Sequence, residues 1–265
     1  MKNFEAAKEL FKDSVDPFFY FDSINAEIAR TKLQEAIGDI SLPLIFIVGE
    51  PGVGKSQMLH VMHQATALRA TTVLIDHPFF NANDILKALY TRAGLHYDSS
   101  KDDVSCFAEL IEAYESRLCT LFIDEAQLLN DEQFEMIRLL SDTNVFQFVL
   151  AIHTKEAMQL LKKPSFKTRK KLVLEYGNLE ENEVLRYIQS LLMNQMLGDI
   201  ALMFSKNDAK VIARYAKGNF RTIKRFLYTL MKLLDYAQVN HLSKYQNINS
   251  CLLTMAALDI GLIRD

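Results

Sequence analysis

The feature that most constrains the fold is a glycine-rich loop between an apolar strand and a helix. The loop reads Gly49-Glu50-Pro51-Gly52-Val53-Gly54-Lys55-Ser56, and an apolar run rich in β-branched residues, 42–48, comes directly before it. This pattern is a complete phosphate-binding loop, because glycines let the backbone curl until its N–H groups point at phosphate oxygens. The helix that follows adds the positive end of its dipole.

The polar residues of this loop have distinct expected tasks. Lys55 would reach the β- and γ-phosphates of a nucleotide, and the Ser56 hydroxyl would hold Mg²⁺. The residues expected to bind the nucleotide are Gly49, Glu50, Pro51, Gly52, Val53, Gly54, Lys55, Ser56 and Gln57.

A second motif places two carboxylates at the end of another apolar strand. Residues 121–123 are apolar, and Asp124 and Glu125 follow them directly. An open parallel sheet binds its ligands at the carboxyl ends of its strands. We expect Asp124 to bind Mg²⁺ and Glu125 to orient and polarise the attacking water, which predicts an ATP hydrolase.

The nucleotide is expected to be ATP rather than GTP. The segment 205–208, Ser-Lys-Asn-Asp, faintly resembles a guanine-reading box, but it is better explained as a helix cap. A GTPase would also have Asp-x-x-Gly after its third strand, where this chain has Asp-Glu-Ala-Gln at 124–127.

Short apolar runs alternate with helical spacing over the first two thirds of the chain. The runs that predict buried strands are 42–48, 71–75, 120–123 and 146–152, with a weaker fifth at 172–174. Strands that alternate with helices of this size form a parallel sheet covered by helices, so we expect the α/β class.

The strand pattern ends near residue 177, and only helical patterns follow. Helix starts are indicated by Asn178 with Glu181, by Ser205 with Asp208, and by Asn219 after Gly218. We therefore expect an α/β domain over residues 1–177 and an α-helical lid domain over residues 178–265.

The charge and cysteine content of the chain limit its expected binding partners and cellular location. The formal charge is −3, which argues against a global field that attracts nucleic acid or anionic membranes. Residues 1–178 carry 19 Lys/Arg against 25 Asp/Glu, and residues 179–265 carry 11 against 8.

The three cysteines have no disulfide or zinc spacing, and no apolar segment is long enough to span a bilayer. We expect a cytoplasmic protein with no membrane span of its own.

Three further positions would complete a site for ATP hydrolysis. His153 and Thr154 end the fourth strand, where either could contact the γ-phosphate or the water, although a plain polar strand end explains them equally well. Arg169 precedes the fifth strand and could reach a neighbouring subunit's phosphate as an arginine finger. The alternative is that its basic run, residues 162–171, is a solvated or acid-binding patch. Arg221 lies in the first turn of a helix and could close over the nucleotide, or be an ordinary surface charge.

The order of these motifs resembles the AAA+ superfamily. More narrowly it is similar to ATPases of the general secretion pathway A type and of mannose-sensitive pilus assembly. The resemblance spans roughly residues 16–237. Its motifs are Asp-Pro-Phe-Phe-Tyr-Phe at 16–21, the phosphate-binding loop, Asp-Glu-Ala-Gln-Leu-Leu at 124–129, Leu-Glu-Glu-Asn-Glu at 179–183, Phe-Ser at 204–205 and Gly-Asn-Phe-Arg-Thr-Ile at 218–223.

The resemblance implies an α/β ATPase module with strand order 5-1-4-3-2, a helical lid and ATP-dependent assembly into a homo-oligomeric ring. It makes Arg221 the sensor-2 residue, Arg169 the finger and His153 the sensor-1 residue, where relatives usually carry Gln or Asn. It also implies a protein partner in a secretion, type IV pilus or DNA-uptake machine. Secretion-type relatives continue into a transmembrane helix and a peptidoglycan-binding domain, which this sequence lacks. We therefore expect a cytoplasmic accessory ATPase, with contact to the inner membrane only through a partner.

Two other functions remain open. The first is a DNA-associated ATPase of the transposition or replication type, for which the basic run 162–171 could supply phosphate contacts. The net charge and the lack of a helix-turn-helix pattern disfavour DNA as a partner. The second is a switch that binds ATP and a partner but scarcely turns over, against which the intact Glu125 argues.

Overall fold

The computed structural model describes residues 2–76, 83–115 and 117–263, which form two compact units. The α/β unit comprises Ile24–Pro51 and Lys55–Tyr176. The helical unit comprises Met1–Ser23, Gly52–Gly54 and Gly177–Asp265. Each unit is described by itself.

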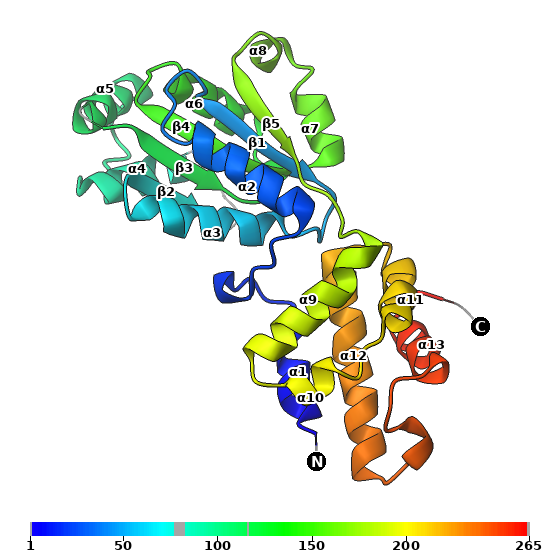
Figure 1. Ribbon diagram of the computed structural model, residues 1–265. Helices are drawn as coiled ribbons and strands as arrows, with labels where there is room; N and C mark the ends of the chain where they lie inside the picture. Colours follow the sequence, from blue (N-terminus) through cyan, green and yellow to red (C-terminus); the bar gives the residue numbers. More distant parts are fainter. Residues whose placement is uncertain (1, 77–82, 116, 264–265) are drawn as a thin grey trace. The chain divides into compact units, whose positions relative to one another are not determined.

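The α/β unit is built on a five-stranded parallel sheet in the order β2-β3-β4-β1-β5 (Figure 1). Its strands are β1 (Leu44–Gly49), β2 (Thr71–Ile75), β3 (Cys119–Ile123), β4 (Phe146–His153) and β5 (Lys171–Glu175). The predicted class and the predicted order 5-1-4-3-2 are confirmed, because the two orders are one order counted from opposite edges.

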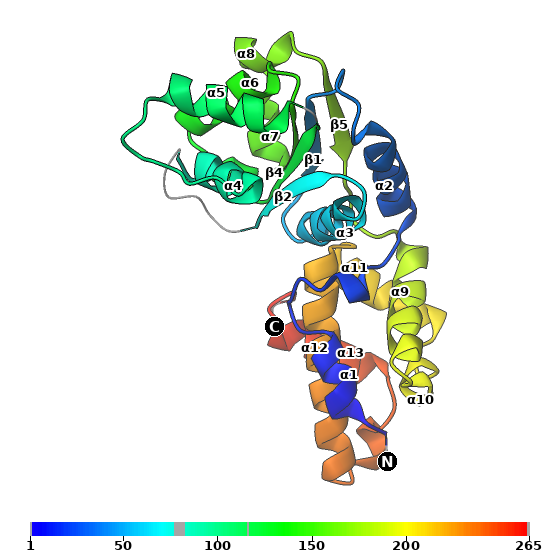
Figure 2. The ribbon, with the colours of Figure 1, turned by 90° about the vertical axis from the view of Figure 1, so that its left-hand side faces the viewer.

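Helices cover both faces of this sheet (Figure 2). One face packs against α2 (Ile24–Ala36) and α3 (Lys55–Ala67). The other face shares one hydrophobic core with α4 (Asn83–Ala93), α5 (Asp103–Tyr114), α6 (Asp131–Ser141), α7 (Thr154–Leu160) and α8 (Pro164–Lys167). Strands buried on both faces explain why the apolar runs in the sequence are continuous rather than alternating.

A fully buried glutamine fastens the connection that leads into β1. The Gln147 amide nitrogen lies 2.9 Å from the Ala36 and Leu42 carbonyl oxygens and 3.2 Å from that of Asp39. Its amide oxygen accepts from the Gly38 N–H at 3.0 Å. β1 therefore begins at Leu44, two residues later than predicted, since residue 42 belongs to this anchored connection.

The helical unit has a core of its own, to which the N-terminus of the chain contributes. Its helices are α1 (Phe4–Leu10), α9 (Glu181–Asn194), α10 (Gly198–Ala201), α11 (Lys206–Ala216), α12 (Phe220–Val239) and α13 (Ser250–Asp259), with short 3₁₀ turns at Pro17–Phe19 and Ser243–Tyr245. Over the described residues, none of the helices combines the length and apolar character that a membrane crossing requires.

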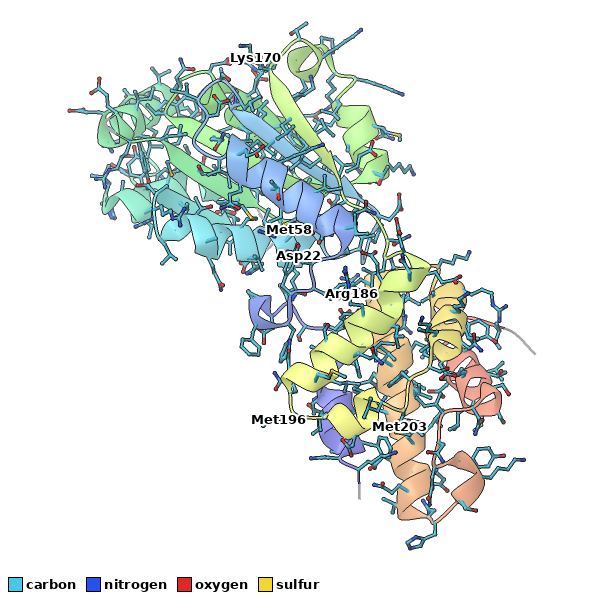
Figure 3. The ribbon with its side chains drawn as sticks, in the orientation of Figure 1. Asp22, Met58, Lys170, Arg186, Met196 and Met203 are labelled. Atoms are coloured by element: carbon cyan, nitrogen blue, oxygen red, sulfur yellow. The ribbon has the colours of Figure 1, made fainter. Side chains whose placement is uncertain are left out.

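The division of the chain differs at the N-terminus from the expected domains, 1–177 and 178–265. Phe4, Ala7 and Phe11 are buried in the core of the helical unit, where α1 packs on α12. Arg186 of α9, labelled with Asp22 in Figure 3, donates to the Asp22 carbonyl at 3.2 Å. Residues 1–23 therefore belong to the helical unit because their apolar face is buried there.

Two of the three predicted helix starts match the structure. Ser205 and Asp208 form the predicted capping box of α11, and the Asn219 side chain caps α12 by accepting from the Thr222 N–H. The first start is shifted, because α9 begins after Glu180 rather than after Asn178.

Candidate nucleotide site

The phosphate-binding loop joins β1 to α3 in the predicted way. β1 ends at Gly49 and α3 begins at Lys55. Gly52 has φ +79° and Gly54 has φ +107°, which are conformations that other residues rarely adopt. The two glycines therefore give this loop its shape.

The lysine of the loop is buried and points back along it. Lys55 is only 7% exposed, and its Nζ donates to the Gly49 carbonyl at 2.9 Å and to the Glu50 carbonyl at 3.0 Å. A buried ammonium group needs such oxygen partners, and phosphate oxygens would serve it equally well. This arrangement fits the expected role of Lys55 at a nucleotide phosphate.

Ser56 and Asp124 come together from the start of α3 and the end of β3. Burial raises the pKa of the Asp124 carboxyl above its ordinary value, and a hydrogen bond with the Ser56 hydroxyl opposes that shift. A cation here would favour the ionised carboxylate, and a hydroxyl with a carboxylate is a donor set that suits Mg²⁺. Among the described residues, no group of three or more His, Cys, Asp or Glu gathers at a metal-binding distance.

Glu125 is held in an unusual backbone conformation beside Asp124. Its φ of +49° is left-handed, which is uncommon for a residue with a side chain, and its N–H donates to the Asp124 carboxylate at 2.8 Å. Such a conformation persists only where the surrounding structure enforces it, and conformations of this kind are common at functional sites. The two carboxylates therefore have fixed and separate orientations.

A glutamine bridges Glu125 to the end of β4. Gln127 lies in the 3₁₀ turn Ala126–Leu128, and its amide nitrogen donates to the Glu125 carboxylate. Its amide oxygen accepts from the His153 backbone N–H at 3.3 Å. The His153 Nε2 lies 3.7 Å from the same Glu125 carboxylate. The sequence contained Gln127 only as part of a family motif, and this role was not predicted for it.

The sheet register explains why these residues meet. β4 lies between β1 and β3, and His153 is paired with Gly49, the last residue before the loop. The carboxyl ends of β1, β3 and β4 thus bring the predicted residues Lys55, Asp124, Glu125 and His153 to one edge. Thr154 begins α7, directly after His153.

Arg169 lies near the amino-terminal ends of the strands, at the opposite end of the sheet from the loop. β5 begins at Lys171, which pairs with Leu44, the first residue of β1. The Arg169 guanidinium forms an ion pair with Asp142, which follows α6, and its Nε donates to the Ser165 carbonyl at 3.0 Å. Arg169 therefore lies away from the phosphate-binding loop of its own chain, and a role at a neighbour's site stays a prediction.

Arg221 is the second residue of α12, in the helical unit. Its Nε lies 3.1 Å from the Asp13 carboxylate, and both side chains are about half exposed. Its expected role toward the nucleotide also stays a prediction.

Comparisons with known proteins agree with this geometry. Residues 42–161, which include the loop, Asp124, Glu125 and His153, match the model of a family described as an AAA domain, AAA_22. No curated protein matches the chain in sequence.

Several solved structures share the fold. The chain is similar to the Walker-type ATPase PABY2304 of Pyrococcus abyssi, with TM-score 0.59, 14% identity, and coverage of 89% of this chain and 78% of that one. It is also similar to domain III of the Thermotoga maritima replication initiation protein DnaA, with TM-score 0.58, 16% identity, and coverage of 94% and 97%. Drosophila ORC bound to DNA gives TM-score 0.64, 17% identity, and coverage of 97% and 70%.

The fold and the matched domain together define the structural class of the chain. The chain has the P-loop AAA+ fold, with a five-stranded parallel sheet and a helical C-terminal region. The predicted enzyme class, a P-loop ATPase, agrees with the matched domain and with the Walker-type ATPase among the similar structures. The resemblance to AAA+ proteins is confirmed, whereas the narrower likeness to the secretion-pathway type stays a prediction.

Proposed function

We propose that this chain binds ATP with Mg²⁺ at the phosphate-binding loop and hydrolyses it. The observation that carries the proposal is the Glu125 carboxylate, oriented by Gln127 and adjacent to His153 at the edge where the loop begins. A carboxylate held in this way can orient and polarise water for attack on a phosphate.

The residues divide the work between binding and hydrolysis. The loop backbone and Lys55 bind the phosphates, and Ser56 with Asp124 holds the metal ion. Mg²⁺ would supply neutralisation of charge on the phosphate oxygens. Glu125 positions the water, while His153 or Thr154 contacts the γ-phosphate or that water.

We further propose that the ATPase works as a homo-oligomer beside a secretion, type IV pilus or DNA-uptake machine. In such an assembly Arg169 would act on a neighbour's nucleotide, and Arg221 would act as the sensor-2 residue of the helical lid. The support for this setting is the family resemblance in residues 16–237. A cytoplasmic location, with contact to the inner membrane through a partner, belongs to the same proposal.

Two substitutions test the proposed site directly. Glu125→Gln keeps the shape of the side chain but removes its charge, so it should bind ATP with near-normal affinity and lose hydrolysis by about 100-fold or more. Lys55→Ala should lose binding itself. Nucleotide binding and steady-state phosphate release measure the two effects separately. Wild-type turnover in Glu125→Gln would refute the role of Glu125.

A DNA-associated ATPase is the second candidate. The observation in its favour is that the similar structures include ORC bound to DNA and a replication initiation protein. Stimulation of the ATPase rate by double-stranded DNA, which fades as salt rises, would favour this candidate over the secretion or pilus role.

A further inference from the structure

A row of cations follows one face of α11 in the helical unit. Its members are Lys206, Lys210, Arg214 and Lys217, all exposed. At 100° and 1.5 Å per residue, the first three lie within about 80° of one another and extend about 12 Å along the helix. Lys217 is the left-handed residue that directly follows α11. We call these four residues the α11 row.

This row borders a groove on the helical unit. The groove has a volume of about 480 Å³, and Lys210, Arg214 and Lys217 line it with Glu181 and the apolar residues Leu179, Val211 and Ala213. A lining with three cations and one acid among apolar residues suits a ligand that carries several anionic groups on a less polar frame.

Among the residues that the structure describes, one cation of the row is in an ion pair, and the Arg214 guanidinium lies 5.8 Å from the centre of the Tyr215 ring. Lys210 lies 3.5 Å from the Glu181 carboxylate, in a largely exposed pair that contributes little. The carboxylate of Asp208, another nearby acid, accepts from Ser205 in the capping box. Lys206 is the first residue of α11, where a cation opposes the helix dipole. The stability of α11 therefore does not account for a cation at this position.

The basic run 162–171 contrasts with this row. Three of its six cations are engaged within the chain. Lys163 pairs with Asp131, Arg169 pairs with Asp142, and the Lys171 Nζ donates to the Phe166 carbonyl at 2.8 Å. Its other three members, Lys162, Lys167 and Lys170, are exposed and are distributed from the segment before α8 to the start of β5, where Figure 3 labels Lys170.

We propose that the α11 row binds the phosphate backbone of a nucleic acid. Residues four apart on a helix are separated by about 6 Å along its axis. That interval is close to the separation of successive phosphates on an extended strand, so neighbouring cations of the row can contact consecutive phosphates. The apolar lining of the groove accepts the sugars. This surface lies outside the proposed ATPase site and would give the DNA-associated candidate its contact with the strand, and binding there does not depend on hydrolysis.

The test is a matched pair of triple variants of the 265-residue chain. The row variant is Lys206→Gln, Arg214→Gln and Lys217→Gln, and the control variant is Lys162→Gln, Lys167→Gln and Lys170→Gln. Each removes three exposed charges, and neither alters the Lys210–Glu181 pair or a proposed site residue. Fluorescence anisotropy with labelled 30-nucleotide single strands and 30-base-pair duplexes, across a salt series without nucleotide, measures binding.

We expect the row variant to bind at least about tenfold more weakly at 0.1 M salt. Its log–log salt slope should be shallower by about 2.7 for duplex, or about 2 for single strands. The affinity of the control variant should stay within about twofold of wild type. If the row variant loses more affinity for duplexes than for single strands, or the reverse, the form with the larger loss is the one that the row binds. Equal binding by all three proteins, or no binding by wild type, overturns the proposal. A loss confined to the control variant assigns binding to the 162–171 run and also overturns it. Competition by polyglutamate as effective as that by DNA would show that the ligand is an acidic protein.

ATPase activity of both variants, measured without DNA, should equal that of wild type. Failure of the proposed hydrolysis would appear in this second measurement alone, so the two proposals can fail independently.

Discussion

Replacing Gln127 with methionine should slow ATP hydrolysis without weakening ATP binding. Methionine has nearly the same length, so it keeps the packing of the turn but cannot hydrogen-bond to Glu125 or to the His153 N–H. The Glu125 carboxylate would then lose the group that fixes its direction, while Lys55 and the loop stay as they are. Gln127 is a positioning residue in this scheme.

The size of the effect follows from the bond that is lost. A hydrogen bond to a charged group is worth about 1.5–3 kcal/mol, and each 1.36 kcal/mol is a factor of ten in rate. Glu125 is 43% exposed, so water replaces part of the bond and the lower limit applies. We expect kcat to fall about tenfold, with the KM for ATP changed by less than about twofold.

Steady-state phosphate release over a range of ATP concentrations separates kcat from KM. Leu128→Met in the same turn is the control, since Leu128 is exposed and should tolerate the change. Gln127→Glu should be slower than Gln127→Met, because it places a second carboxylate against Glu125. A folded Gln127→Met protein with wild-type kcat would refute the role of Gln127 in positioning Glu125. A parallel rise in KM would instead place Gln127 in nucleotide binding.

Two further predictions concern other parts of the α/β unit. Gln147→Leu should lower the free energy of unfolding in urea by about 2–4 kcal/mol, because it orphans buried backbone groups. The exposed Gln34→Leu should change it by less than about 0.5 kcal/mol, and equal effects would contradict the anchoring role. Arg169→Ala should lose hydrolysis but keep ATP affinity, and mixing it with Lys55→Ala should restore activity if Arg169 exchanges Asp142 for a neighbour's phosphate. A mixture that stays inactive would exclude the finger.

The sheet could be predicted from sequence because its strands are buried on both faces. The run 71–75 coincides with β2, residue for residue. The fifth run was weaker, and β5 is an edge strand with Val173 39% exposed, so fewer of its side chains had to be apolar. The order of the strands came from the family resemblance rather than from the periodicity of the chain.

The place of the N-terminus could not be predicted in this way. Phe4, Ala7 and Phe11 have the spacing of an apolar helix face, but that spacing does not say which core receives them. Their partner is α12, and the Lys2 backbone is bound by the side chain of Gln238, 236 residues away. The start of α9 was misplaced for a similar reason, since the Leu179 N–H donates to the Gly218 carbonyl and keeps that residue outside the helix.

In the candidate site, too, the residues that are contiguous in sequence could be predicted, whereas a contact between distant residues could not. The loop and the Asp124–Glu125 pair are contiguous in sequence, so local patterns reveal them. The contact between Gln127 and His153 joins residues 26 apart, and it depends on a sheet register that no local pattern contains.

The two basic segments of the chain show that the density of charge along a sequence does not predict which charges are available to a partner. The run 162–171 was the most prominent basic segment of the sequence, yet Arg169 pairs with Asp142, 27 residues away, and Lys163 with Asp131, 32 residues away. The α11 row is less dense in sequence, and only its first residue, Lys206, lies in a segment to which the sequence assigns a role, as a helix cap. Helical geometry nevertheless aligns Lys206, Lys210 and Arg214 on one exposed face, so the number of cations that a partner can reach depends on the fold more than on their density along the chain.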